Sequence, residues 1–175
     1  ELLPVFAAEL VRLKVDVIVT TSTPTTQAAQ KATTNIPIVM VSVADPVESG
    51  LVKSLAHPGD NITGLSNIAT DIIPKQLEML LGMVPKLSRV AVLLNPANSA
   101  HASGLKIVRA AAQRVKVKVV PVEARTTTEI EQAFSAIARE KAEAVIVVPD
   151  PLFNQQERQI AELAAKNRLA SIAAF

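Results

Sequence analysis

Hydroxyl, amide and carboxylate side chains gather at four points of the sequence, each directly after an apolar run. These side chains belong to Thr21, Ser22, Thr23, Asp45, Asn95, Asn98, Ser99 and Asp150. Hydroxyl groups and free backbone N–H groups at the start of a helix can hold a carboxylate without a charged side chain. An aspartate can receive an ammonium group through charge-assisted hydrogen bonds. We therefore interpret these residues as candidate contacts for a small polar ligand.

Each of these residues also has a purely structural interpretation. Ser22 or Thr23 would cap the helix that follows. Asp45 and Asp150 each precede a proline, which suits an N-cap aspartate with proline at the next position. The two asparagines suit a turn around Pro96. Capping and ligand contact are compatible, so both interpretations stay open at the level of the sequence.

Sequence patterns of catalysis, metal binding and nucleotide binding are missing. The chain has no cysteine, which excludes disulfides, thiol catalysis and cysteine-based metal sites. His57 and His101 have no spaced carboxylate or histidine partner, so we expect no metal. No serine lies in a G-x-S-x-G elbow, and the glycines form neither a G-x-G-x-x-G sequence nor a P-loop. We therefore expect no enzyme activity and no cofactor.

The composition favours a folded protein that binds neither nucleic acid nor membrane. The chain has 175 residues, 49% hydrophobic and 19% charged, which suffices for one ordinary domain or two small lobes. Arg114, Lys116 and Lys118 alternate with valines, so we predict one solvated strand face. Four phenylalanines without tryptophan or tyrosine give no stacking platform for bases. No apolar stretch reaches the roughly 18 residues of a membrane span, and no signal segment opens the chain.

Apolar strands must position the polar groups. Strands that lead into them are predicted over residues 15–20, 37–43, 89–94 and 144–148. Runs of Val, Ile and Leu with little alternation are typical of parallel strands buried on both faces. Ligands of such sheets lie beyond the carboxyl ends of the strands. The polar loops there, which are predicted to line a ligand crevice, span residues 21–25, 42–46, 95–99 and 149–154.

Helix and strand alternate along the whole chain. Helices are predicted over residues 3–14, 25–34, 46 to about 55, 74–84, 100–114, 127–141 and 152–167. Further strands are predicted over residues 62–66, 116–122 and 170–175. This alternation favours an α/β fold with doubly wound parallel sheets.

Two helices carry specific expectations. Ser99 would cap the helix at 100–114, whose buried face is predicted to hold Leu105, Val108, Ala112 and Val115. Thr127 would be the N-cap of the following helix, with its inward face formed by Ile130, Phe134 and Ile137.

The element series breaks near residues 61–71. Residues 1–66 are predicted to belong to an N-terminal lobe and residues 67–175 to a C-terminal lobe, with the crossover in that break. The alternative is a single sheet of about five to seven strands.

Several motifs in a fixed order carry a resemblance to a known family. The chain contains a Thr-rich loop, then DPVESGLV, PGDNITG, LLGMVP and LLNPANS, and finally VVPDPLFN. This order resembles that of the ABC transporter substrate-binding proteins of the tryptophan/tyrosine-binding type, and the match covers essentially every residue.

The resemblance implies a fold. Members of the family have the type I periplasmic-binding-protein fold, in which two α/β lobes of doubly wound parallel sheet close over one small molecule. They begin before the position of Glu1 and continue beyond that of Phe175, so the chain resembles an interior fragment, incomplete at both ends. Open sheet edges predict that such a fragment would pair with itself.

The resemblance also implies a function. It indicates the solute-binding component of an ABC importer, which captures a small polar or amino-acid-like ligand between its lobes. An ABC permease in the membrane would be its partner, and its location would be periplasmic or extracytoplasmic. The alternative is a ligand-sensing domain of a regulatory or receptor protein, because the same fold serves both.

Overall fold

The computed structural model describes residues 2–67 and 72–173. The chain divides into two compact units, which we call unit 1 (Glu1–Ile68) and unit 2 (Ala69–Phe175). Each unit has its own parallel sheet, of three and four strands respectively, so the α/β prediction is confirmed and the single-sheet alternative is wrong. The assignment of the units to two lobes stays a prediction. Part of the predicted crossover, 68–71, and the end of the last predicted strand, 174–175, lie outside the described residues.

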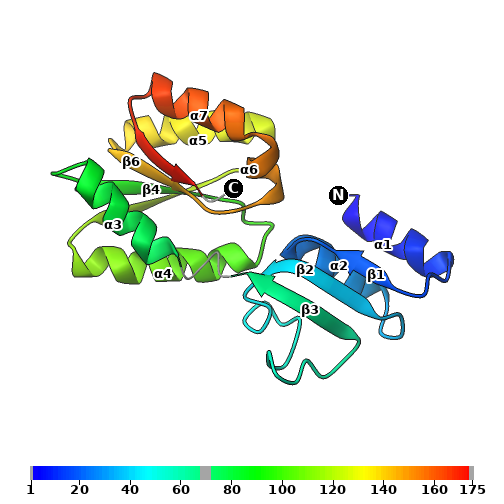
Figure 1. The fold of residues 1–175 in the computed structure, drawn as a ribbon. Helices are drawn as coiled ribbons and strands as arrows, with labels where there is room; N and C mark the ends of the chain where they lie inside the picture. Colours follow the sequence, from blue (N-terminus) through cyan, green and yellow to red (C-terminus); the bar gives the residue numbers. More distant parts are fainter. Residues whose placement is uncertain (1, 68–71, 174–175) are drawn as a thin grey trace. The chain divides into compact units, whose positions relative to one another are not determined.

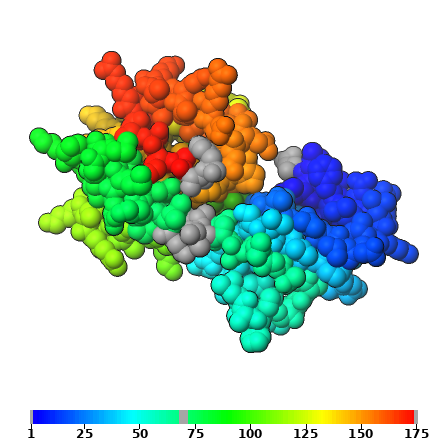
Figure 2. All heavy atoms as spheres, viewed as in Figure 1, coloured from blue at the N-terminus to red at the C-terminus, as the bar shows by residue number. Residues whose placement is uncertain are grey.

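Unit 1 is a small parallel sheet with helices packed over one face (Figure 1). Its elements are α1 (Leu3–Arg12), β1 (Ile18–Thr20), α2 (Thr23–Ala32), β2 (Ile38–Ala44) and β3 (Ile62–Asn67). Ile18, Ile38 and Ile62 lie side by side across the sheet and pack with Ala29 of α2. Helix α1 packs against α2 and lies at the surface of its unit, as the dark-blue atoms of Figure 2 show.

Unit 2 is a parallel sheet covered by helices on both faces (Figure 1). Its elements are α3 (Ile73–Met83), β4 (Arg89–Leu94), α4 (Ala100–Arg114), β5 (Lys118–Glu123), α5 (Thr127–Arg139), β6 (Ala144–Val147), α6 (Pro151–Gln155), α7 (Glu157–Lys166) and β7 (Ala170–Ala173). The strand order is β5-β4-β6-β7. Helices α3 and α4 cover one face, whereas α5 and α7 cover the other. None of the helices in the described ranges is both long and apolar enough to cross a membrane.

The two central strands of unit 2 are buried on both faces. In β4, Val90 and Val92 pack on the side of α3 and α4, and Ala91 and Leu93 pack on the side of α5 and α7. The residues of β6 likewise alternate between the two faces of the sheet. Full burial of one such aliphatic side chain stabilises a fold by about 1.5–3 kcal/mol. The apolar runs without alternation therefore arise, as predicted, from strands that are buried on both faces.

Strand β3 comes unusually close to β2 at Gly64. Gly64 pairs with Met40 and has a φ of 135°. A Cβ atom there would collide with the backbone carbonyl of Met40. Only glycine fits this backbone conformation and this spacing.

Four helices end on a basic residue in the left-handed conformation. Lys14 (φ 53°), Lys116 (φ 58°), Lys141 (φ 54°) and Arg168 (φ 54°) follow the last turns of α1, α4, α5 and α7. After α5, the N–H of Ala142 donates to the carbonyl of Ile137 over 3.2 Å, which closes the helix end. Glycine is the usual residue in this conformation, because a side chain there costs about 1–2 kcal/mol.

These helix ends correct the prediction for the basic cluster. Arg114 is the last residue of α4 and Lys116 lies in the left-handed turn, so only Lys118 belongs to a strand. The side chains are exposed, but they do not form one strand face. Val115, predicted on the buried face of α4, is exposed at the same helix end, whereas Val108 is buried as predicted.

Three further helix predictions are wrong in detail. Residues 46–55 form turns instead of a helix, with Gly50 at a φ of 70°. The helix predicted over 152–167 is split into α6 and α7 at Gln156. The N-cap of α5 is Thr126, whose hydroxyl accepts from the N–H of Glu129, and not Thr127. The predicted inward residues of α5 are buried.

Candidate functional site

The ends of β4 and β6 lie at one edge of the unit 2 sheet. The strands are neighbours and parallel, with Leu93 opposite Val147. Their carboxyl ends therefore meet, and the polar loops that follow, 95–99 and 148–150, come together although about fifty residues separate them. This is the place in which a doubly wound sheet holds ligands.

Asp150 is the centre of this edge. Its backbone is extended (φ −151°, ψ 142°), and its Oδ1 accepts the N–H of Leu152 over 3.0 Å, so it caps α6. Pro151 follows in the first turn, where its missing N–H costs nothing. The N-cap prediction for Asp150 is confirmed. Its side chain is only 2% exposed, so the carboxylate needs further hydrogen-bond donors.

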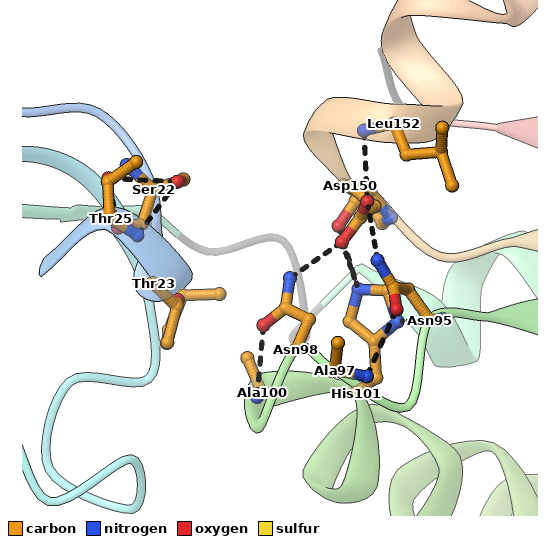
Figure 3. Close-up of polar contacts among 12 residues, drawn as sticks. Ser22, Thr23, Thr25, Asn95, Ala97, Asn98, Ala100, His101, Asp150 and Leu152 are labelled. Carbon is orange, nitrogen blue, oxygen red and sulfur yellow. Dashed lines mark hydrogen bonds and ion pairs between the residues drawn. The ribbon is translucent and has the colours of Figure 1, made fainter. Parts of the chain in front are cut away.

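Two asparagines of the β4–α4 loop supply these donors (Figure 3). The Asn95 amide donates to Oδ1 of Asp150 over 3.2 Å, and the Asn98 amide donates to Oδ2 over 2.9 Å. The carbonyl oxygens of the same side chains accept the N–H groups of Ala97 (3.0 Å) and Ala100 (3.2 Å). Each asparagine therefore closes its own turn and binds the carboxylate at the same time. The predicted turn around Pro96 is confirmed.

His101 completes the cluster from the first turn of α4. Its Nδ1 accepts the N–H of Asn95 over 2.7 Å, and its Nε2 donates to the carbonyl of Pro149 over 3.1 Å. Nε2 also lies 3.6 Å from Oδ2 of Asp150. The ring is buried, with the Phe153 ring 6.3 Å away between centroids. The imidazole thus contacts both loops at once.

His101 is neutral in this environment. Burial lowers its pKa from the ordinary 6.5, because the charged ring would lose its hydration, while the Asp150 carboxylate and the Pro149 carbonyl oppose that shift. The geometry supports the neutral form independently, since Nδ1 accepts a hydrogen bond and cannot carry a proton. The approach of Nε2 to Asp150 is therefore a contact between a dipole and a charge, not an ion pair.

The predicted residues of unit 1 lie at the start of α2 and the end of β2. Ser22 is the N-cap of α2, and its hydroxyl accepts from the N–H of Thr25, while the Thr25 hydroxyl accepts from the N–H of Ser22. This reciprocal capping box confirms the capping interpretation of Ser22. Pro24 has no N–H, and within the described residues no hydrogen bond engages the Thr23 N–H. The helix start therefore keeps one backbone N–H without an acceptor among the described residues.

Thr23 and Asp45 occupy neighbouring places in unit 1. The Thr23 hydroxyl donates to the carbonyl of Ala44, the last residue of β2, over 3.4 Å. Asp45 follows with a left-handed φ of 45°, and its Oδ1 accepts the N–H of Glu48 over 3.2 Å. The prediction of an extended helix N-cap at Asp45 is wrong: its φ is left-handed, a conformation that aspartate tolerates, and turns follow instead of a helix.

The structure brings together some of the predicted residues and not others. Asn95, Asn98 and Asp150 contact one another directly. Ser99 occupies the N-cap position of α4, but its side chain makes no capping hydrogen bond, because Asn98 takes that role. Thr21 is exposed between β1 and α2. Ligand contact by any of these residues stays a prediction. Among the described residues, no group of three or more His, Asp or Glu side chains could hold a metal ion.

His101 is the member of the cluster that sequence reasoning missed. It lies in a helix, away from the end of any predicted strand, and therefore gave no binding signal. A usable signal exists, because side chains in the first turn of a helix point back toward its N-terminus. A histidine seven residues after the end of a strand can therefore reach the strand-end loop, here at Asn95.

A recess beside β5 is a different feature. It is lined by residues 118–122 together with Ala136 of α5 and Glu140, the residue that follows α5, and Lys118 pairs with Glu140 over 3.7 Å. None of the predicted ligand contacts lies in it.

Pro121 interrupts the hydrogen-bonding edge of β5, as is usual for edge strands that resist pairing. The predicted self-association of the chain is untested.

Comparison with protein families gives one match over nearly the whole chain. The family described as ABC transporter substrate binding protein matches residues 3–174. The chain is also similar to a tyrosine-binding protein of Clostridioides difficile (strain R20291), with 34% identity over 167 residues. That alignment covers 95% of the chain and 48% of the relative, so the chain spans about half of the relative's length.

Solved structures agree on the fold. A conserved domain protein from Vibrio cholerae is 30% identical, with a TM-score of 0.87 over 98% of the chain and 58% of the other protein. An ABC domain from Streptococcus pneumonia, solved in complex with L-Trp, is 22% identical, with a TM-score of 0.87 over 99% of the chain and 58% of the other. The predicted type I periplasmic-binding-protein fold is thereby confirmed.

Proposed function

We propose, from the finding that the chain belongs to the ABC transporter substrate-binding protein family, that the whole protein binds a small amino-acid-like solute for an ABC importer. Proteins of this family bind their solutes and pass them on, and the family is not an enzyme family. The single structural observation that carries the proposal is the cluster of the half-buried Asn95 with the buried Asn98 and Asp150 at the carboxyl-end edge of the unit 2 sheet.

The chemistry of the cluster suggests which group of the solute it binds. Asp150 carries a negative charge that is held by neutral amide and N–H donors, so no cation neutralises it within the described residues. A carboxylate offers about four acceptor positions. Asn95, Asn98 and Leu152 occupy three of them, and a ligand ammonium would form a charge-assisted hydrogen bond at the fourth. The half-buried Asn95 gives a polar rim through which the ammonium would approach.

The start of α2 in unit 1 is a second candidate contact set, which we consider by itself. The Thr23 N–H and the exposed Thr21 hydroxyl are donors at the positive end of a helix. Donors of this kind fit the carboxylate of an amino-acid-like solute. Asp45, at the end of β2, is a further candidate for the ammonium group.

The phenylalanines described in unit 2 offer no stacking partner for an aromatic side chain of the solute. The relatives include a tyrosine-binding protein and a domain solved with L-Trp. In unit 2, however, Phe134 and Phe153 are fully buried in the core, and neither can stack on a ligand ring. We therefore propose the amino-acid backbone, and not an aromatic ring, as the feature that these residues recognise.

Location and partner follow from the family. Substrate-binding proteins of ABC transporters work outside the cytoplasm and deliver their solute to a membrane permease. We propose an extracytoplasmic location and an ABC permease as partner for this protein as well.

The test is thermal unfolding of the whole protein in the presence of single amino acids and of small organic acids without an amino group. A ligand that binds only the native state raises the melting temperature by mass action. We expect stabilisation by at least one amino acid, strongly reduced in Asp150→Asn. Asp60→Asn is the matched control, because Asp60 is an exposed carboxylate paired with Lys53. Equal stabilisation of all three proteins, or none by any solute, would contradict the proposal.

A further inference from the structure

The His101 ring bridges the two loops that carry the candidate ligand contacts. On one side it holds the backbone of Asn95, the first residue after β4, at 2.7 Å. On the other side it holds the backbone of Pro149, directly before Asp150, at 3.1 Å. The two loops otherwise meet through side-chain hydrogen bonds between the asparagines and the carboxylate. The ring therefore sets the distance between the two backbones.

Both contacts require one protonation state of the ring. Nδ1 accepts the Asn95 N–H, so it must be unprotonated, and Nε2 faces a carbonyl oxygen, so it must carry the proton. The other neutral tautomer would place two N–H groups face to face at Asn95 and two acceptors face to face at Pro149. The doubly protonated ring would keep the contact with Pro149 and lose the contact with Asn95.

We propose that His101 is a positioning residue, whose neutral ring protonated on Nε2 fixes the Asn95 and Asp150 loops for ligand binding, and whose protonation on Nδ1 weakens that binding. The inference rests on the proposed solute-binding function. It adds a group that does not contact the ligand and that makes affinity depend on pH.

The groups around the His101 ring determine how ligand affinity changes as the pH falls. Among the described residues, the Asp150 carboxylate is the charged group found to act on His101, while its other neighbours are the Pro149 carbonyl, the Asn95 N–H and the Phe153 ring. Protonation of Nδ1 repels the Asn95 N–H and draws the ring toward Asp150. A positive ring beside Asp150 also competes with a ligand ammonium for the same carboxylate. Both effects lower affinity in acid.

The first test is an NMR titration of the whole protein without ligand. The nitrogen shifts of the imidazole report the tautomer, and the amide proton of Asn95 reports its hydrogen bond. We expect the Nε2–H tautomer at neutral pH, and one common midpoint, below pH 6.5, for the ring and the Asn95 amide. The opposite tautomer, or an Asn95 amide that does not follow the ring, would overturn the inference whatever the protein binds.

The second test measures the affinity for L-tyrosine and for L-tryptophan between pH 7 and pH 5. The wild-type protein should bind about tenfold more weakly at pH 5, the effect of about one lost hydrogen bond. His101→Asn, which keeps an acceptor for Asn95 but does not titrate, should be independent of pH in this range. His57→Gln is the matched control, because His57 is the other histidine and is exposed in unit 1. It should keep the wild-type pH profile.

The two tests separate this inference from the proposed function. If the ring and the Asn95 amide titrate together but no amino acid binds, neither these two nor any of the thermal-unfolding panel, His101 positions the loops and the proposed solute class is wrong. If an amino acid binds with the same pH profile in wild type and in His101→Asn, the solute class holds and the role of His101 is overturned. His101→Gln, which keeps a donor for Pro149, serves as the second variant if His101→Asn does not fold.

Discussion

The Asn98 side-chain amide donates to the Asp150 carboxylate over 2.9 Å, and both side chains are buried. The two residues come from loops that follow adjacent parallel strands. Asn98 at the same time closes the first turn of α4, and Asp150 caps α6. One hydrogen bond therefore links the starts of two helices at the edge of the sheet where we propose that ligand binds.

Replacement of Asp150 by asparagine should destabilise unit 2. The new amide group would face the amide donors of Asn95 or Asn98, and a buried donor without an acceptor costs about 1–3 kcal/mol. We expect the free energy of unfolding to fall by about 2 kcal/mol, measured by denaturant titration followed by circular dichroism. The control Asp60→Asn, at an exposed position, should change it by less than about 0.5 kcal/mol. Equal stability of the two variants would show that the cluster is not a structural centre.

Replacement of Gly64 by alanine should unfold unit 1 preferentially. The added Cβ would collide with the Met40 carbonyl, and the φ of 135° is strained for any other residue. We expect a loss of more than about 3 kcal/mol, because neither backbone can move without breaking the sheet pairing. Hydrogen exchange would locate the loss in β2 and β3. Gly82→Ala is the control: nothing lies near its Cβ position and it is helical, so stability should rise.

Replacement of Lys141 by glycine should stabilise the protein. Lys141 lies in the left-handed conformation after α5, at a φ of 54°, and glycine adopts this conformation without steric cost. We expect a gain of about 1 kcal/mol in the free energy of unfolding. Lys106→Gly, in the exposed middle of α4, should instead lose about 1 kcal/mol. The opposite signs distinguish conformational strain from loss of positive charge, which the two variants share.

Stability should fall in two steps as the solution is acidified. The pKa of His101 in the folded protein is lowered by burial, so the unfolded chain takes up a proton first and stability is lost as pH falls below about 6.5. The pKa of Glu143 is lowered by its hydrogen bonds from the N–H groups of Ser88 and Arg89. Its contribution is fully present above 4.5 and is lost as pH falls below that value, through the lower pKa of the folded state.

Thermal unfolding between pH 8 and pH 3 would resolve the two steps. His101→Asn should remove the first step and leave the second, whereas Glu143→Gln should do the reverse. An unchanged first step in His101→Asn would mean that another group causes it.

Much of the fold is predictable because burial dominates it. Strand β4 and helix α4 have the predicted bounds, since a strand buried on both faces and an amphipathic helix each leave a clear hydrophobic pattern. The backbone conformation of a turn depends on smaller free-energy differences than burial does. The Asp-Pro sequence recurs at Asp45 and Asp150, yet one aspartate is left-handed in a turn and the other is an extended N-cap. The surrounding chain, not the dipeptide, makes that choice.

The residues of the candidate site were predictable, but the hydrogen bonds between them were not. The strand-end rule places Asn95, Asn98 and Asp150 at the same edge, and the structure adds that they bind one another. The role of His101 depends on a ring orientation that only packing determines. At the start of α2, the Thr-rich sequence indicated free hydroxyl groups, but the hydroxyls of Ser22 and Thr25 each accept the backbone N–H of the other residue.

The most direct test of the central claim is calorimetric titration of the whole protein with the most stabilising amino acid of the panel and with the same compound lacking its amino group. Wild type and Asp150→Asn would be compared in a double-mutant cycle. If Asp150 receives the ammonium group, removal of that group should weaken binding to wild type at least tenfold and binding to Asp150→Asn hardly at all. An equal loss in both proteins would contradict the account.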